Sequence, residues 1–108
     1  MENQKKSNNE IYRVRLESIE DAKGNYDNEI FIFSFQVTDM YKQRRYPFQS
    51  WMSKNGHPQS KVSRACRALM GTDFDIFNND RSVLIGKECL VEVDHSCGNK
   101  IIDFFKIN

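Results

Sequence analysis

A run of apolar residues from Ile30 to Val37 constrains the fold of this chain more than any other stretch. The run has no Gly or Pro and is dominated by β-branched and aromatic side chains, which is typical of a strand rather than a helix. Successive side chains of a strand point to opposite faces, and here one face is entirely apolar. We expect that face to pack in a core. Its members are Phe31, Phe33, Phe35 and Val37.

A second stretch, Arg45 to Met52, repeats the pattern and predicts a neighbouring strand. Tyr46, Phe48 and Met52 are expected to face the core. The outward faces of the two strands differ from these core faces. They carry a guanidinium, two amides and an indole, which a closed core excludes. These candidate binding residues are Arg45, Gln36, Gln49 and Trp51.

Length and composition predict one folded domain. The chain has 108 residues, of which 39% are hydrophobic, 12% aromatic and 29% charged, which is typical of a globular protein. Residues 1–9 are polar and are expected to form a flexible arm, leaving 10–108 as the domain. No run of about 18 apolar residues could span a bilayer and no signal peptide is apparent, so we expect a cytoplasmic protein that does not contact a membrane.

The three cysteines predict neither a disulfide framework nor a zinc site. Cys66, Cys89 and Cys97 are odd in number and contain no C-x-x-C pair. His95 lies near Cys97, but the spacing does not match a structural zinc motif. We therefore expect reduced thiols, no metal and no cofactor.

The predicted order of elements is three strands, a helix and two more strands. The first strand should cover Ile11 to Ile19, with Tyr12, Val14 and Leu16 facing the core. Ser60 and Gly71 have the residue types of a helix N-cap and C-terminal stop. The last two strands should span 88–94 and 100–107. This order, with a helix between the third and fourth strands, is typical of the OB-fold, a five-stranded Greek-key barrel in which strands 2 and 3 and the flanking loops bind oligonucleotides.

Positive charge is concentrated in one segment although the net charge is only +1. The segment from Tyr41 to Arg67 has seven cations and no carboxylate, so we expect one positive flank on the folded domain. Trp51, Tyr41 and Tyr46 are interleaved with these cations. Cations that follow phosphates and aromatic rings that stack on bases are typical of single-strand binding, with a steep salt dependence. The predicted nucleic-acid-binding residues are Arg13, Arg15, Gln36, Lys42, Arg44, Arg45, Gln49, Trp51 and Lys54.

Motifs of catalysis are missing from the sequence. It contains no P-loop, dinucleotide-binding, nucleophile-elbow or H-E-x-x-H pattern. Asp73, Asp75 and Asp80 could suggest a divalent-ion site, but the intervening Phe74, Ile76 and Phe77 are typical of core anchors that cover one end of the barrel. We expect a protein that is not an enzyme.

Two motifs resemble small OB-fold proteins of bacteriophages and other mobile genetic elements. The first is a helix of small residues, Lys61 to Met70, that ends in Gly71. The second is the strand entry Leu84-Ile85-Gly86-Lys87-Glu88-Cys89-Leu90-Val91-Glu92-Val93. The resemblance implies a role in replication or recombination, as a single-stranded DNA-binding protein or as an accessory subunit of a polymerase or helicase. It also implies structural roles for Gly86, Val91 and Val93.

Three hypotheses remain open from the sequence. The first is a single-stranded DNA-binding protein. The second is a protein-interaction module that docks on a replication polymerase or helicase through Ile30, Ile32 and Trp51. The third is an inhibitor of a nucleic-acid enzyme that uses the acidic loop 73–80 as a phosphate mimic.

Overall fold

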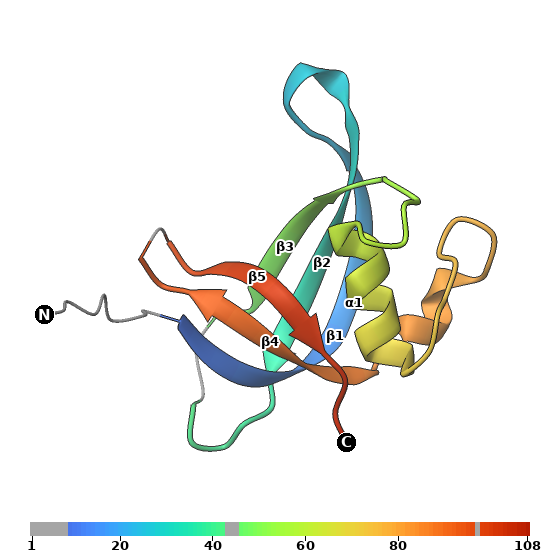
Figure 1. The fold of residues 1–108 in the computed structure, drawn as a ribbon. Helices are drawn as coiled ribbons and strands as arrows, with labels where there is room; N and C mark the ends of the chain where they lie inside the picture. Colours follow the sequence, from blue (N-terminus) through green and yellow to red (C-terminus); the bar gives the residue numbers. More distant parts are fainter. Residues whose placement is uncertain (1–8, 43–45, 97) are drawn as a thin grey trace, which may run out of the picture.

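The computed structural model describes residues 9–42, 46–96 and 98–108. Its five strands form one antiparallel sheet in the order β3-β2-β1-β4-β5 (Figure 1). The strands are β1 (Asn9–Lys23), β2 (Glu29–Val37), β3 (Phe48–Ser53), β4 (Glu88–Asp94) and β5 (Lys100–Phe105). Helix α1 (Lys61–Met70) follows β3, and the short helices η1 (Asn25–Asp27) and η2 (Arg81–Leu84) lie in loops. The prediction of a mainly β domain with five strands and one helix is confirmed.

The sheet curls until its two edge strands approach each other. β3 and β5 come into contact at these edges. Among the described residues, no ladder of backbone hydrogen bonds joins them. Helix α1 packs against β5, β3 and β4, next to the place where β3 and β5 approach each other (Figure 1). None of the helices in the described ranges is long and apolar enough to cross a membrane.

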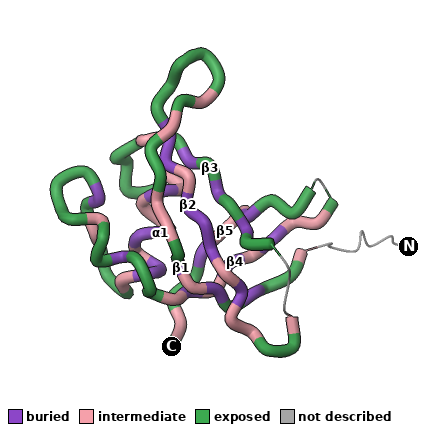
Figure 2. The backbone as a smooth tube through the Cα atoms, turned by 180° about the vertical axis from the view of Figure 1, so that it is seen from behind, coloured by how far each residue is buried: buried purple, intermediate pink, exposed green. Residues whose placement is uncertain are grey.

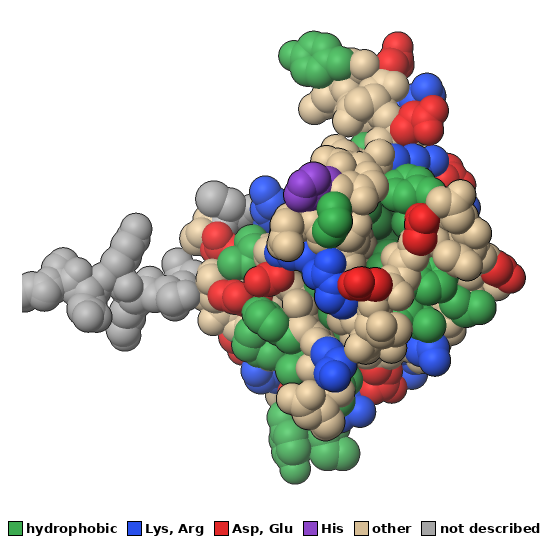
Figure 3. Space-filling view, turned by 45° about the vertical axis from the view of Figure 1, so that its right-hand side comes forward, with side chains coloured by type: hydrophobic (Ala, Val, Ile, Leu, Met, Phe, Trp, Pro, Cys, Tyr) green, Lys and Arg blue, Asp and Glu red, His purple; other side chains and the backbone are tan. Residues whose placement is uncertain are grey.

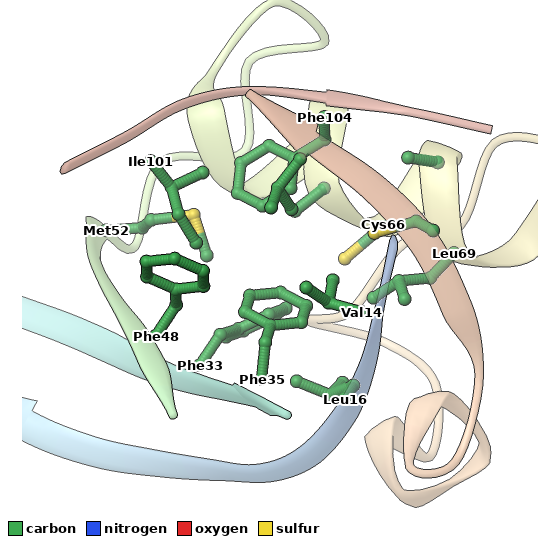
Figure 4. Close-up of a cluster of buried hydrophobic side chains, with 14 of the residues drawn as sticks. Val14, Leu16, Phe33, Phe35, Phe48, Met52, Cys66, Leu69, Ile101 and Phe104 are labelled. Carbon is green, nitrogen blue, oxygen red and sulfur yellow. The ribbon is translucent and has the colours of Figure 1, made fainter. Parts of the chain in front are cut away.

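The core fills the inside of the curled sheet (Figure 4). The predicted inward face of β2 is confirmed, because Phe31, Phe33, Phe35 and Val37 are at most 3% exposed. β3 adds Phe48 and Met52, as predicted. Ile30 differs from the prediction: it is 5% exposed although it belongs to the outward face, and it has Ala22 and Ser53 as neighbours on the two flanking strands.

The predicted caps of the helix are confirmed. The Ser60 hydroxyl accepts a hydrogen bond from the Ser63 backbone N–H at 3.2 Å, and Gly71 ends α1 in the left-handed region with φ 78°. The residues that share the buried face are Val62, Ala65, Cys66, Ala68 and Leu69. Three residues were expected to have structural roles because of the resemblance. Gly86 lies in a left-handed conformation with φ 88°, and Val91 and Val93 are fully buried.

The solvent side of α1 is less open than the sequence pattern suggests. Arg64 Nη1 donates to Asp103 Oδ1 on β5 at 2.6 Å, so this guanidinium is tied to the sheet. Lys61 is half-buried, and burial, helped by the nearby Lys100 and Arg64, lowers the pKa of its ammonium to about 8. The helix is therefore held to β5 by polar contacts as well as by its apolar face.

β1 is longer than predicted and contains a bulge. It continues past Ile19 to Lys23, and its register against β2 shifts between Leu16 and Ser18. The shift changes the alternation, so a simple two-residue period ends near Glu17. The β1–β2 hairpin projects from the body of the molecule, and its tip is exposed (Figures 1 and 2).

Two further segments differ from the sequence expectation. β3 begins at Phe48, and Tyr46, which was expected in the core, lies before the strand and is 65% exposed. In the loop 72–80, Ile76 is buried as expected, whereas Phe77 is 44% exposed. Of the predicted arm 1–9, Asn9 begins β1 and the rest lies outside the described residues.

Candidate nucleic-acid interface

The indole of Trp51 lies open on the outward face of β3. Its exposed fraction is 63%, and Gln49, two residues earlier, is also exposed on the same face. Both residues line a shallow groove with a volume of about 500 Å³, which we call the Trp51 groove. The groove is lined by Tyr46, Pro47, Phe48, Gln49, Trp51, Gly98 and Asn99. It thus lies between β3 and the turn that joins β4 to β5.

The outward face of β2 continues this surface. Ile32 lies opposite Trp51 in the strand register, and Ser34 lies opposite Gln49. Gln49 Nε2 donates to Ser34 Oγ at 3.3 Å, which links the two strands on this face. Gln36 is partly exposed and lies opposite Arg15 on β1. The predicted outward placement of the two glutamines and the indole is therefore what the structure shows.

A hydrogen-bond network anchors the β4–β5 turn, which forms one wall of the Trp51 groove. His95 Nδ1 lies 2.5 Å from Asn99 Oδ1, and His95 Nε2 lies 3.0 Å from Glu10 Oε1 and 3.1 Å from the Tyr12 hydroxyl. The Tyr12 hydroxyl donates to Glu10 Oε1 at 2.8 Å. That bond, with His95 and Lys42 nearby, holds the pKa of the Glu10 carboxyl below its usual range. The turn is therefore fixed to β1.

The sequence did not reveal this network, because its members are far apart along the chain. Alternation placed Tyr12 in the core, and its ring is indeed buried, but its hydroxyl reaches a polar cluster at the edge. Asn99 has φ 56°, a left-handed conformation that Asn tolerates better than most residues. The pair Gly98-Asn99 was the one signal in the sequence, because it indicates a turn with left-handed residues.

Lys54 does not lie beside Trp51. Its Nζ is 2.7 Å from Asp21 Oδ1 and 4.8 Å from the ring centre of Phe31, a core residue. Arg81 Nη2 binds the other carboxylate oxygen of Asp21 at 2.5 Å. The two cations, Arg81 first, hold the pKa of Asp21 far below its usual range. Lys54 therefore belongs to an ion-pair cluster under the β1–β2 hairpin, on the opposite face of the sheet from the indole.

The three other predicted cations that the structure describes, on β1 and in the β2–β3 loop, also have partners. Arg13 Nε lies 2.9 Å from Glu88 Oε1, and Arg15 Nε lies 2.6 Å from Glu17 Oε2. Lys42 Nζ donates to the backbone oxygen of Ile11 at 2.8 Å. Arg44 and Arg45 lie outside the described residues.

The described cations do not form the positive flank that was expected. Within 41–67, Arg64 pairs with Asp103 and Arg67 with Asp73, so these charges are offset by carboxylates from other segments. Figure 3 shows Lys and Arg side chains next to Asp and Glu side chains over the face in view. The described part of this acid-free segment thus contributes to a surface of mixed charge.

A second cavity, of about 620 Å³, lies between the loops on either side of α1. Arg67 lines this cavity. Its guanidinium donates to the Pro58 backbone oxygen at 2.7 Å and to Asp73 Oδ1 at 3.0 Å. Among the described residues, no group of three His, Cys, Asp or Glu side chains could hold a metal ion. Burial raises the pKa of Cys66 and of Cys89 to about 12, so both thiols stay protonated.

Comparison of the chain with protein-family models, with curated proteins and with solved structures finds no significant match.

Proposed function

We propose that this chain is a non-enzymatic OB-fold protein that binds single-stranded DNA and acts as a replication or recombination accessory factor of a mobile element. The strand order supports the fold, because β1 pairs with both β2 and β4 while β3 and β5 approach each other, as in a partly open OB barrel. The position of the Trp51 groove also supports it. OB-folds bind oligonucleotides on strands 2 and 3 and on the loops between strands 1 and 2 and between strands 4 and 5.

The exposed indole of Trp51 is the observation that carries the proposal. The indole is 63% exposed on a strand, so a partner that covers it removes apolar surface from water, which is favourable. A nucleobase is such a partner, and stacking is worth roughly 1 to 3 kcal/mol per base. Tyr46 offers a second exposed ring on the same groove.

Binding of a labelled 12-nucleotide single strand, followed by fluorescence anisotropy, tests the proposal. Trp51→Ala should weaken binding by about 5- to 150-fold, the range that corresponds to one lost stack. Phe105→Ala is the matched control, because Phe105 is an aromatic residue that is 39% exposed on β5, outside the groove and outside the strands and loops with which OB-folds bind oligonucleotides. Equal affinity of both variants and the wild type would remove Trp51 from the interface.

A protein-interaction module is the second candidate function, and the pairing of Ile32 with Trp51 favours it. These two side chains share the outward face and form a partly apolar patch. Of the docking residues expected from the sequence, Ile30 is buried and so is not available for docking. In this version a replication polymerase or helicase covers the patch.

Adding a candidate polymerase or helicase to the anisotropy measurement separates the two functions. A docking module should bind no oligonucleotide alone and should recover binding with the partner. The acidic loop supports a phosphate mimic less well, because Asp75 accepts hydrogen bonds from Phe77 N–H and Asn78, and Asp80 caps η2. Those carboxylates already stabilise their own loop.

A further inference from the structure

We infer that the Trp51 groove recognises bases rather than phosphates, so that its ligand is a short single-stranded segment held by stacking with a weak dependence on salt. This inference rests on the proposed function and specifies the ligand chemistry of the same site. It replaces the expectation, from the acid-free segment 41–67, that cations dominate the binding.

Among the described residues that line the groove, the phenol of Tyr46 is the one ionisable group. The other members of the lining are apolar side chains, amides and a glycine. Such a lining can stack on the faces of bases and can hydrogen-bond to their edges. The described part of the lining has no ammonium or guanidinium group to neutralise a phosphate. Gln49 lies beside the indole. One N–H of its amide donates to Ser34 Oγ, and its oxygen and second N–H are the groups that a base edge would meet.

The described cations that were predicted to contact the phosphate backbone of a nucleic acid are bound to other groups of the protein. Lys54 binds Asp21 on the other face of the sheet, and Lys42 binds the Ile11 backbone oxygen and lies 3.8 Å from Glu10. Arg13 and Arg15 each pair with a carboxylate on the surface. The nearby carboxylates offset part of the positive charge of these cations, which reduces what each of them adds to phosphate binding.

The number of phosphate contacts sets the salt dependence, which makes the inference measurable. For a single strand, log K falls with log salt with a slope of about −0.7 for each phosphate neutralised. The seven cations of segment 41–67 would together give a slope of about −5. Arg44 and Arg45, which precede Tyr46 in the sequence, would by themselves give about −1.4. We expect a slope between 0 and about −2.

Two oligonucleotides of equal charge separate bases from phosphates. One is a 12-nucleotide oligo-dT, and the other is the same chain with every base removed, which keeps all phosphates and sugars. Binding of both to the full chain is measured by anisotropy at four salt concentrations from 50 to 400 mM. We expect the abasic strand to bind at least about 10-fold more weakly, because it offers nothing to stack.

The controls make each outcome decisive. Trp51→Ala should reduce the binding of oligo-dT toward that of the abasic strand, whereas Phe105→Ala, at an exposed aromatic residue of β5 outside the groove, should leave the binding of both strands unchanged. Equal binding of the two strands, or a slope of about −4 or steeper, overturns the inference while leaving single-strand binding in place. Failure of both strands to bind at 50 mM salt overturns the proposed function itself, and the inference with it.

Discussion

The ammonium nitrogen of Lys54 lies 2.7 Å from Asp21 Oδ1, and this contact ties the segment after β3 to the end of β1. Arg81, which precedes β4, binds the same carboxylate. Asp21 therefore joins three segments that are distant in the sequence. The contact also explains why Lys54, which follows Trp51 by three residues, does not serve the groove.

We expect Asp21→Asn to lower the free energy of unfolding at pH 7 by no more than about 1 kcal/mol, because the network is exposed and screened by solvent. The folded pKa of Asp21 is lowered, so its contribution is fully present above the unfolded pKa of about 3.9 and is lost as the pH falls below that value. Urea unfolding at pH 7 and pH 3 measures both effects. Glu20→Gln, on the same exposed strand end, is the control; a loss equal to that of Asp21→Asn would contradict the account.

The tip of the β1–β2 hairpin holds two adjacent residues, Tyr26 and Asp27, with φ near +60°. A turn with two such residues favours Asn followed by Gly, and a bulky aromatic residue is strained there. We expect Tyr26→Asn with Asp27→Gly to raise the free energy of unfolding by about 0.5 to 1 kcal/mol. Chemical denaturation measures this; a destabilised double variant would mean that the ring of Tyr26 makes a stabilising contact.

Phe35 and Trp51 are both aromatic strand residues, yet their truncation should lower the stability of the fold by very different amounts. Phe35 is fully buried, with ring centres of Phe33 and Phe104 at 6.1 and 5.9 Å. Phe35→Ala should cost about 3 to 5 kcal/mol of stability. Trp51→Ala should cost less than about 1 kcal/mol, because the indole is already in water. Thermal unfolding of the two variants tests the contrast, and a large loss from Trp51→Ala would place the indole in the core.

The thiols of Cys66 and Cys89 should resist chemical labelling in the folded protein. Both are fully buried and their pKa is raised to about 12, so almost no thiolate exists at pH 8. In a Cys97→Ser variant, a disulfide reagent should therefore modify neither thiol before unfolding and both in denaturant. Rapid labelling under native conditions would show that the core around α1 opens readily.

The strand pattern and the helix caps could be predicted from the sequence because they depend on neighbouring residues. Phe31 to Val37 alternate without interruption, and Ser60 and Gly71 satisfy the ends of α1 locally. The end of β1 was missed because the bulge near Glu17 changes the alternation, so Asp21 looked like part of a turn. Tyr46 was placed in the core because its parity matches Phe48, although the strand begins after Pro47.

The charge distribution could not be predicted from the sequence because it depends on long-range pairing. Arg64 and Asp103 are 39 residues apart, and Arg81 and Asp21 are 60 apart. A run free of carboxylates says nothing about acids that arrive from other strands. Exposure of the indole was easier to predict, since Trp51 alternates with buried Ser50 and Met52.

The emission of Trp51 gives the most direct test of the central claim, because the chain has a single tryptophan. Titration of the wild-type protein with a 12-nucleotide single strand should quench and shift this emission in a saturable manner, since a stacked base replaces water on the indole. A matched titration with duplex DNA of the same length should have little effect. Unchanged emission at saturating single strand, with binding established by anisotropy, would contradict the claim that the indole carries the interface.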